Sequence, residues 1–233
     1  MLVDPIIDRK GSIRMSRPIS PILIVMILLA PLLRPSPVRP FPDAGLTFDR
    51  ERVEMDIAGE GEGFRVHVNG LYEFHNSGDG AIKGTIFYPF PLADGAEYPD
   101  AIRVSRRTEG GGLVEIPFTR NRAGISFAIS LEPKRDLALR VDYSQHTAIG
   151  RATYILSTTA VWGRPLEVAE FEVRLPSQYH LERLSYPPDR IERKGKKTVY
   201  TIRRIDFMPA EDLEVYWVVP TGASSAGDPG PGR

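Results

Sequence analysis

The chain has 233 residues, 42% of them hydrophobic, so it can fold around a core, and disorder throughout is excluded. Lysine plus arginine equals aspartate plus glutamate at 30 each, so no global charge draws the chain onto nucleic acid or an anionic membrane. Because the chain has no cysteine, disulfides, thiolate metal sites and cysteine nucleophiles are all excluded.

Residues 1–44 contain a short apolar segment, uninterrupted over residues 22–30 and preceded by two arginines. This pattern is typical of a secretory signal, and it is shorter than the roughly 20 residues that cross a bilayer as a helix. We expect Met15 to be the true start, because the residues before it include two acids. The segment lacks a good cleavage site, so a short membrane anchor stays open as the alternative. Either alternative places the following domain outside the cytoplasm, in the periplasm, in the extracellular space or anchored at the membrane.

Residues 46–219 alternate apolar and polar side chains with a period of two, which predicts strands. The clearest run is Phe64–Phe74, where only Leu71 breaks the alternation. Counting shorter runs between turns, we expect about ten to twelve strands. The ten shorter runs are 53–57, 82–88, 102–105, 114–118, 125–131, 137–143, 152–156, 171–175, 198–202 and 213–219.

No stretch after residue 46 shows a long helical period, and many short strands with frequent turns are typical of a sandwich or barrel. We therefore predict an all-β fold, an antiparallel two-sheet sandwich, as one domain over residues 46–219. The tail, residues 220–233, is rich in proline, glycine and serine, and we expect it to be disordered.

The segment Val66–Asn76, followed by Phe87–Gly95 and Ile102–Val104, resembles the opening of vault/inter-alpha-trypsin (VIT) domains. The resemblance falls within residues 64–107 and implies a β-sandwich that supports interactions with other proteins. VIT domains usually precede a von Willebrand type A domain with a metal-binding D-x-S-x-S motif. The nearest string here, D-Y-S-Q-H over residues 142–146, ends in histidine, so no metal site is carried over.

Four aromatic residues are the candidate ligand- or partner-binding residues. Tyr88 and Phe90 lie in a cluster of aromatic residues and prolines, and Tyr154 leads toward Trp162, which precedes a glycine at an expected turn. Exposed aromatic rings at loop ends stack on sugars or anchor protein partners. The alternative is that they close the core. If Trp162 binds a partner, replacing it with alanine should reduce partner retention without lowering thermal stability.

We predict no catalytic residue, metal site or cofactor from the sequence motifs. The four histidines form no H-E-x-x-H, and no serine lies in a G-x-S-x-G elbow. Gly110–Gly112 lacks the spacing of a nucleotide loop and is interpreted as a hairpin turn. The basic run over residues 190–204 is either a local positive patch or, the interpretation we prefer, a solvated strand edge.

The resulting hypothesis is an exported, non-enzymatic β-sandwich that acts as a protein- or polysaccharide-binding or structural accessory module of the cell envelope. We expect no nucleic-acid partner, and membrane contact only through an uncleaved N-terminal segment. The alternative is a secreted hydrolase whose site is assembled on sandwich loops. A pocket that places a serine or carboxylate within hydrogen-bond reach of a histidine would favour the hydrolase.

Overall fold

The computed structural model describes residues 45–93 and 95–220, which fold almost entirely into strands. Predictions made for residues 1–44 and 221–233 lie outside the described residues. The described strands are β1 (Leu46–Glu60), β2 (Gly63–Asn76), β3 (Ile82–Pro89), β4 (Asp100–Arg107), β5 (Leu113–Glu115), β6 (Phe118–Asn121), β7 (Gly124–Leu131), β8 (Asp136–Thr147), β9 (Arg151–Tyr154), β10 (Leu166–Pro176), β11 (His180–Leu184), β12 (Arg190–Lys194), β13 (Lys197–Phe207) and β14 (Leu213–Val218). A short 3-10 helix, η2 (Thr159–Trp162), lies between β9 and β10.

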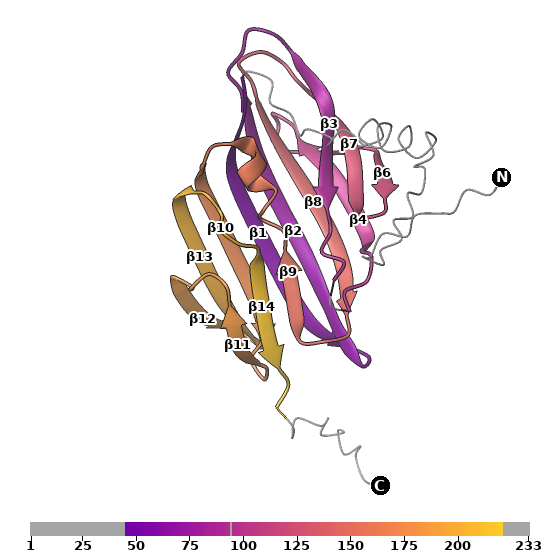
Figure 1. Cartoon of the computed structure of the whole chain (residues 1–233), viewed down its shortest axis with the longest axis vertical. Coiled ribbons are helices and arrows are strands. Elements are labelled where there is room, and N and C mark those ends of the chain that lie inside the picture. The colour runs from indigo at the N-terminus through magenta and orange to yellow at the C-terminus, as the bar shows by residue number, and fades with distance from the viewer. Residues whose placement is uncertain (1–44, 94, 221–233) are drawn as a thin grey trace, which may run out of the picture. The chain divides into compact units, whose positions relative to one another are not determined.

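The strands form one large sheet and two small ones. The eight-stranded sheet has the order β12-β13-β10-β1-β2-β8-β4-β5, and the small sheets have the orders β11-β14-β9 and β3-β7-β6. Both small sheets lie over the same face of the large sheet, with β9 on one side and β3 on the other (Figure 1). Residues of all three sheets pack into a hydrophobic core between the layers. The predicted all-β, sandwich-like fold is confirmed.

Three details differ from the sandwich that we predicted. The described residues form fourteen strands, because β6, β11 and β12 are largely exposed and lack the apolar alternation that reveals a strand. The second layer is split into two sheets. β1 and β10 pair in parallel, whereas the other strand pairs of the described residues are antiparallel. Alternation reports which face of a strand is buried, not its direction or its partner.

The alternation in β2 and β8 predicts correctly which side chains face the core. In β2, Val66, Val68 and Tyr72 are buried, while Leu71 points to the opposite face of the large sheet. In β8 the buried positions continue past the apolar run into Gln145 and Thr147. The inner face of the large sheet therefore becomes polar toward the end of β8.

A bulge in β1 brings an acidic side chain into the core. The pairing of β1 with β2 shifts register between Phe48 and Arg50, so Phe48 and Glu51 are both buried although they are three residues apart. From Glu51 onward the buried residues are the odd-numbered ones, through Val53 and Met55. Without the bulge, one of these two sets would face solvent.

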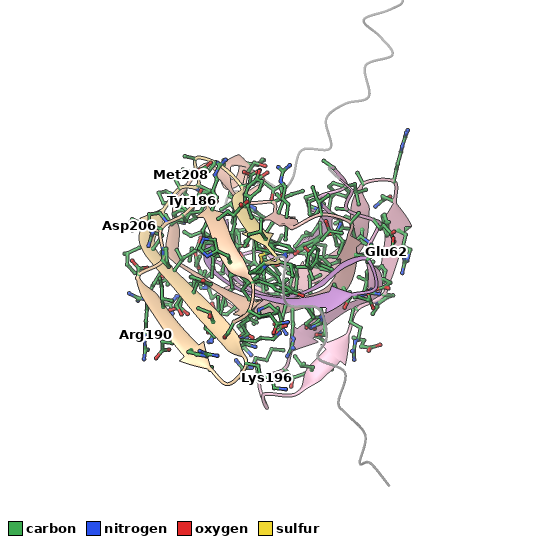
Figure 2. The ribbon with its side chains drawn as sticks, turned by 90° about the horizontal axis from the view of Figure 1, so that it is seen from below. Glu62, Tyr186, Arg190, Lys196, Asp206 and Met208 are labelled. Atoms are coloured by element: carbon green, nitrogen blue, oxygen red, sulfur yellow. The ribbon has the colours of Figure 1, made fainter. Side chains whose placement is uncertain are left out.

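The basic run ends the large sheet, as the strand-edge interpretation predicts. β12 is an outermost strand and pairs on one side with β13. Figure 2 shows Arg190 and Lys196 at the periphery of the molecule, at the start of β12 and at the turn into β13. Charged side chains on an edge strand discourage pairing with another sheet. Within residues 45–93 and 95–220, no helix has the length and hydropathy needed to span a membrane.

Candidate functional site

An open groove of about 340 Å³ lies between the segment that leaves β3 and the strands β9 and β14. Val66 and Val68 of β2 form its apolar base, and Gln145 and Thr147 of β8 add polar atoms. The groove is thus bordered by the segment that follows β3, by strands of the other small sheet and by the large sheet. We call it the seam groove.

Gln145 fixes one wall of the seam groove. Its side-chain nitrogen donates to the backbone oxygens of Pro91 and Glu97, at 2.7 Å each. Ala96 forms an isolated β-bridge with Thr147, which attaches the same segment to the end of β8. Because the buried side-chain nitrogen of Gln145 makes both of these hydrogen bonds, it holds the segment close to the sheet.

The opposite wall carries charge. Nη2 of Arg151 lies 2.7 Å from Oε1 of Glu214, and the Arg151 guanidinium lies 5.1 Å from the centre of the Tyr216 ring. The Tyr216 hydroxyl donates to the other oxygen of Glu214, at 3.1 Å. Asp212, also on this wall, accepts hydrogen bonds from two backbone N–H groups of residues 156 and 157. These contacts pre-organise a polar rim around an apolar base, which suits a ligand with both characters.

Beneath the small sheets, Glu51 is buried among tyrosines. The Tyr154 hydroxyl donates to Oε1 of Glu51 at 2.5 Å, and the Tyr72 hydroxyl lies 2.9 Å from that of Tyr154 and 2.8 Å from that of Tyr88. Oε2 of Glu51 is buried with no hydrogen-bond partner among the described residues. Burial raises the pKa of Glu51 to about 7. The carboxyl group of Glu51 therefore titrates near neutral pH.

Gly70 makes room for this network. A Cβ atom at Gly70 would lie 1.9 Å from the Tyr72 hydroxyl oxygen, so the Tyr72 side chain folds back over the glycine. Burial raises the pKa of Tyr72, Tyr88 and Tyr154 well above the usual value, which keeps their hydroxyls protonated. The chain of hydroxyls joins β9, β2 and β3, the points where the two small sheets meet the large one.

The structure brings three of the four aromatic candidates together. Phe90 lines the seam groove, and its ring centre lies 5.7 Å from that of Tyr88, which bonds to the Tyr72 and Glu51 network. Tyr154 belongs to the same network. Phe90 and Tyr154 are buried, and Tyr88 is partly buried. Their role in binding stays a prediction.

Trp162 lies elsewhere, at the end of η2. Its ring centre is 5.8 Å from that of Phe48 and 5.4 Å from that of Phe74, and it is partly buried against the core. Gly163 follows in the left-handed conformation, with φ of 68°, and ends η2, so the expected turn is present. A binding role for Trp162 also stays a prediction.

Sequence reasoning missed Glu51, Gln145 and Thr147. Each is a polar residue at a position where the period of two places a buried side chain. Glu51 lies two residues before Val53, and Gln145 and Thr147 continue the inward-facing positions of β8. A polar residue at an inward position is uncommon unless it is bonded or functional. That signal identifies the residues but not their partners.

Two histidines have polar partners on the other face of the large sheet. Nδ1 of His67 lies 3.2 Å from Oγ of Ser144, and Nδ1 of His75 lies 2.7 Å from Oδ1 of Asp136. His67 is exposed, at a strand position that faces away from the core. In residues 45–93 and 95–220, no three histidine, aspartate or glutamate side chains are grouped so that they could hold a metal ion.

No protein-family model and no curated protein sequence matches the chain. Its fold is similar to that of a crystallised candidate nutrient-binding protein from Legionella pneumophila, with a TM-score of 0.60 and 14% identity over 74% of this chain and 67% of that one. An M1 zinc metallopeptidase from Deinococcus radiodurans gives a TM-score of 0.45 and 13% identity over 75% of this chain and 43% of the peptidase. This chain therefore spans less than half the length of the peptidase. At 14% identity, the first likeness shows a shared fold.

Proposed function

We propose that the chain is an exported, non-enzymatic binding module of the cell envelope, which holds a protein or polysaccharide partner in the seam groove. The observation that carries this proposal is the mixed lining of the groove, with an apolar base at Val66 and Val68 and a bonded polar rim at Gln145, Arg151 and Glu214. Such sites hold a ligand by apolar contact and orient it with few polar groups.

Two further observations support the proposal. The Legionella pneumophila protein of similar fold is described as a candidate nutrient-binding protein, which is a binding function. The apolar segment over residues 22–30, with arginines before it, supports export by a signal peptide or a short membrane anchor. An exported module of this kind would meet envelope proteins and polysaccharides outside the cytoplasm.

The test compares two exposed apolar residues, one in the groove and one outside it. Leu92 lines the seam groove and is 37% exposed, whereas Val161 lies on η2 and is 54% exposed. We expect Leu92→Asp to reduce retention of the protein on isolated cell envelopes and on immobilised envelope polysaccharide, and Val161→Asp to leave retention unchanged. Equal retention of both variants and the unmodified chain would overturn the role of the groove. Thr153→Trp, which narrows the same groove, provides an independent second variant.

The alternative function, a secreted hydrolase, rests on the contact between His67 and Ser144. A histidine within hydrogen-bond reach can activate a serine hydroxyl as a nucleophile. This pair lies on an exposed sheet face, so its geometry supports the alternative less well than the seam groove supports binding. Hydrolysis of an activated acetate ester by the purified chain, abolished in Ser144→Ala and retained in Ser130→Ala, would favour the hydrolase.

A further inference from the structure

The outer face of the large sheet contains a second concave site. Because β2 sends alternate side chains to opposite faces, Asn69 and Leu71 point away from the core that Val68 and Tyr72 enter. Leu71 was the one residue that broke the alternation of β2, and here it lies in a hollow of about 320 Å³. We call this the outer hollow and define it by Arg52, Asn69, Leu71, Arg107, Leu113 and Arg140.

Two of the three arginines of the outer hollow have guanidinium donors to spare. Arg140 uses Nε and Nη2 on the carboxylate of Asp142, at 2.9 and 3.1 Å. Arg52 comes only within 3.6 Å of Glu54, and the guanidinium of Arg107 has no hydrogen bond or ion pair with any described residue. Planar guanidinium groups with free N–H pairs favour carboxylates, which they bind in a bidentate manner.

The outer hollow also offers apolar surface and hydrogen-bond acceptors. Leu113 is 53% exposed and lines the hollow together with Leu71. The amide nitrogen of Asn69 donates a hydrogen bond to Asp142, at 2.7 Å. The amide oxygen of Asn69 is left as an acceptor in the hollow, together with the carboxylate of Glu54. A ligand that satisfies all of these groups has a carboxylate, hydroxyl donors and an apolar C–H face. A uronic acid has this combination.

A second, smaller hollow of about 220 Å³ continues from the first and shares Arg52 and Leu71 with it. It adds Arg50 and Arg203 as well as Glu73 and Glu170. Arg50 lies 3.6 Å from Glu167, and Arg203 lies 3.2 Å from Glu170. Two adjoining hollows with arginines suit consecutive units of a polymer rather than one small ion. We propose that the outer face binds an acidic polysaccharide, with a uronate carboxylate between Arg52 and Arg107 and the sugar ring on Leu71 and Leu113.

The experiment measures binding of oligogalacturonate to the full chain by titration calorimetry at low salt. The Arg52→Gln and Arg107→Gln double variant should weaken binding by about tenfold or more, because it removes charged hydrogen-bond donors. The matched control is Arg193→Gln, which should not change the affinity, because Arg193 is exposed on the edge strand β12 and its guanidinium bonds to no described residue. Leu71→Ala should also weaken binding, through loss of the apolar contact.

Three probes of other chemistry identify what the site recognises. A neutral oligosaccharide of the same length should not bind, and dextran sulfate and poly-glutamate should bind more weakly than oligogalacturonate. No binding of oligogalacturonate by the unmodified chain would overturn the proposal, and so would equal binding of poly-glutamate or an equal loss in Arg193→Gln. The outcome is independent of the seam groove, because Leu92→Asp changes the opposite face and should leave uronate affinity intact.

Discussion

The hydroxyl of Tyr154 lies 2.5 Å from Oε1 of Glu51, inside the core and 103 residues away along the chain. Glu51 enters the core through a bulge in β1, and Tyr154 ends β9 of a small sheet, so this bond joins the two layers. Through the hydroxyls of Tyr72 and Tyr88, the hydrogen-bond network that starts at Tyr154 continues to the other small sheet. The stability of the fold should therefore depend on the protonation of one carboxyl group.

We expect the free energy of unfolding to fall as pH rises through the pKa of Glu51. The folded chain holds this proton up to about pH 7, whereas the pKa of an unperturbed glutamate is 4.5. The stabilisation is complete below pH 4.5 and is lost as pH rises through 7. The loss at pH 8 amounts to about 3 kcal/mol.

Glu51→Gln should remove this slope, so the variant should gain stability relative to the unmodified chain between pH 5 and about pH 8 in urea unfolding. Glu62→Gln is the control, because Glu62 is exposed at the β1–β2 turn (Figure 2). Parallel pH profiles for Glu51→Gln and the unmodified chain would contradict the titration of Glu51.

Tyr154→Phe should destabilise the protein more at pH 8 than at pH 5. The substitution removes the donor to Oε1, and the ionised carboxylate needs that donor more than the neutral acid does. We expect a loss of about 2 kcal/mol at pH 8, measured by urea unfolding. Tyr200→Phe, at a tyrosine whose hydroxyl bonds to no described residue, should have little effect at either pH. An equal loss at both pH values would mean that the Tyr154 hydroxyl stabilises the neutral and the ionised forms of Glu51 alike.

Asn76→Ala should destabilise the fold without touching either proposed binding surface. The fully buried amide nitrogen of Asn76 donates to the backbone oxygens of Gly80, Leu131 and Glu132, at 2.9 to 3.2 Å. Removal of the amide leaves these oxygens without that donor, at a cost of about 3 kcal/mol. Thermal unfolding of Asn121→Ala, at an exposed asparagine that ends β6, gives the comparison and should change little. An unchanged melting temperature in Asn76→Ala would show that the bonds add nothing to stability.

Trp162→Ala should lower thermal stability, which differs from the effect expected if Trp162 were only a partner-binding residue. The ring packs on Phe48 and Phe74, so its removal costs about 2–3 kcal/mol through lost burial and a residual cavity. Trp162→Phe should restore much of the loss, and Val161→Ala on the same short helix should cost little. If Trp162→Ala and the unmodified chain have the same melting temperature, the tryptophan is available for a partner instead.

The sequence by itself determined the all-β class and the buried faces of β2, β7 and β8, because a strand in a half-buried sheet alternates its side chains whatever its partner. It also placed the basic run at a strand edge. The aromatic candidates were identified by residue type, and three of them prove to be neighbours.

Only the tertiary structure decided which strands are partners and what their polar residues meet. The parallel pairing of β1 with β10 and the division of the second layer into two sheets depend on contacts between segments far apart in the chain. Glu51 acquires its raised pKa from burial that exists only once both layers are assembled. Leu71 and Arg107 share a hollow because three-dimensional pairing sets their strands in one sheet. Local periodicity carries no information about such long-range contacts, so the site could be assembled only from the fold.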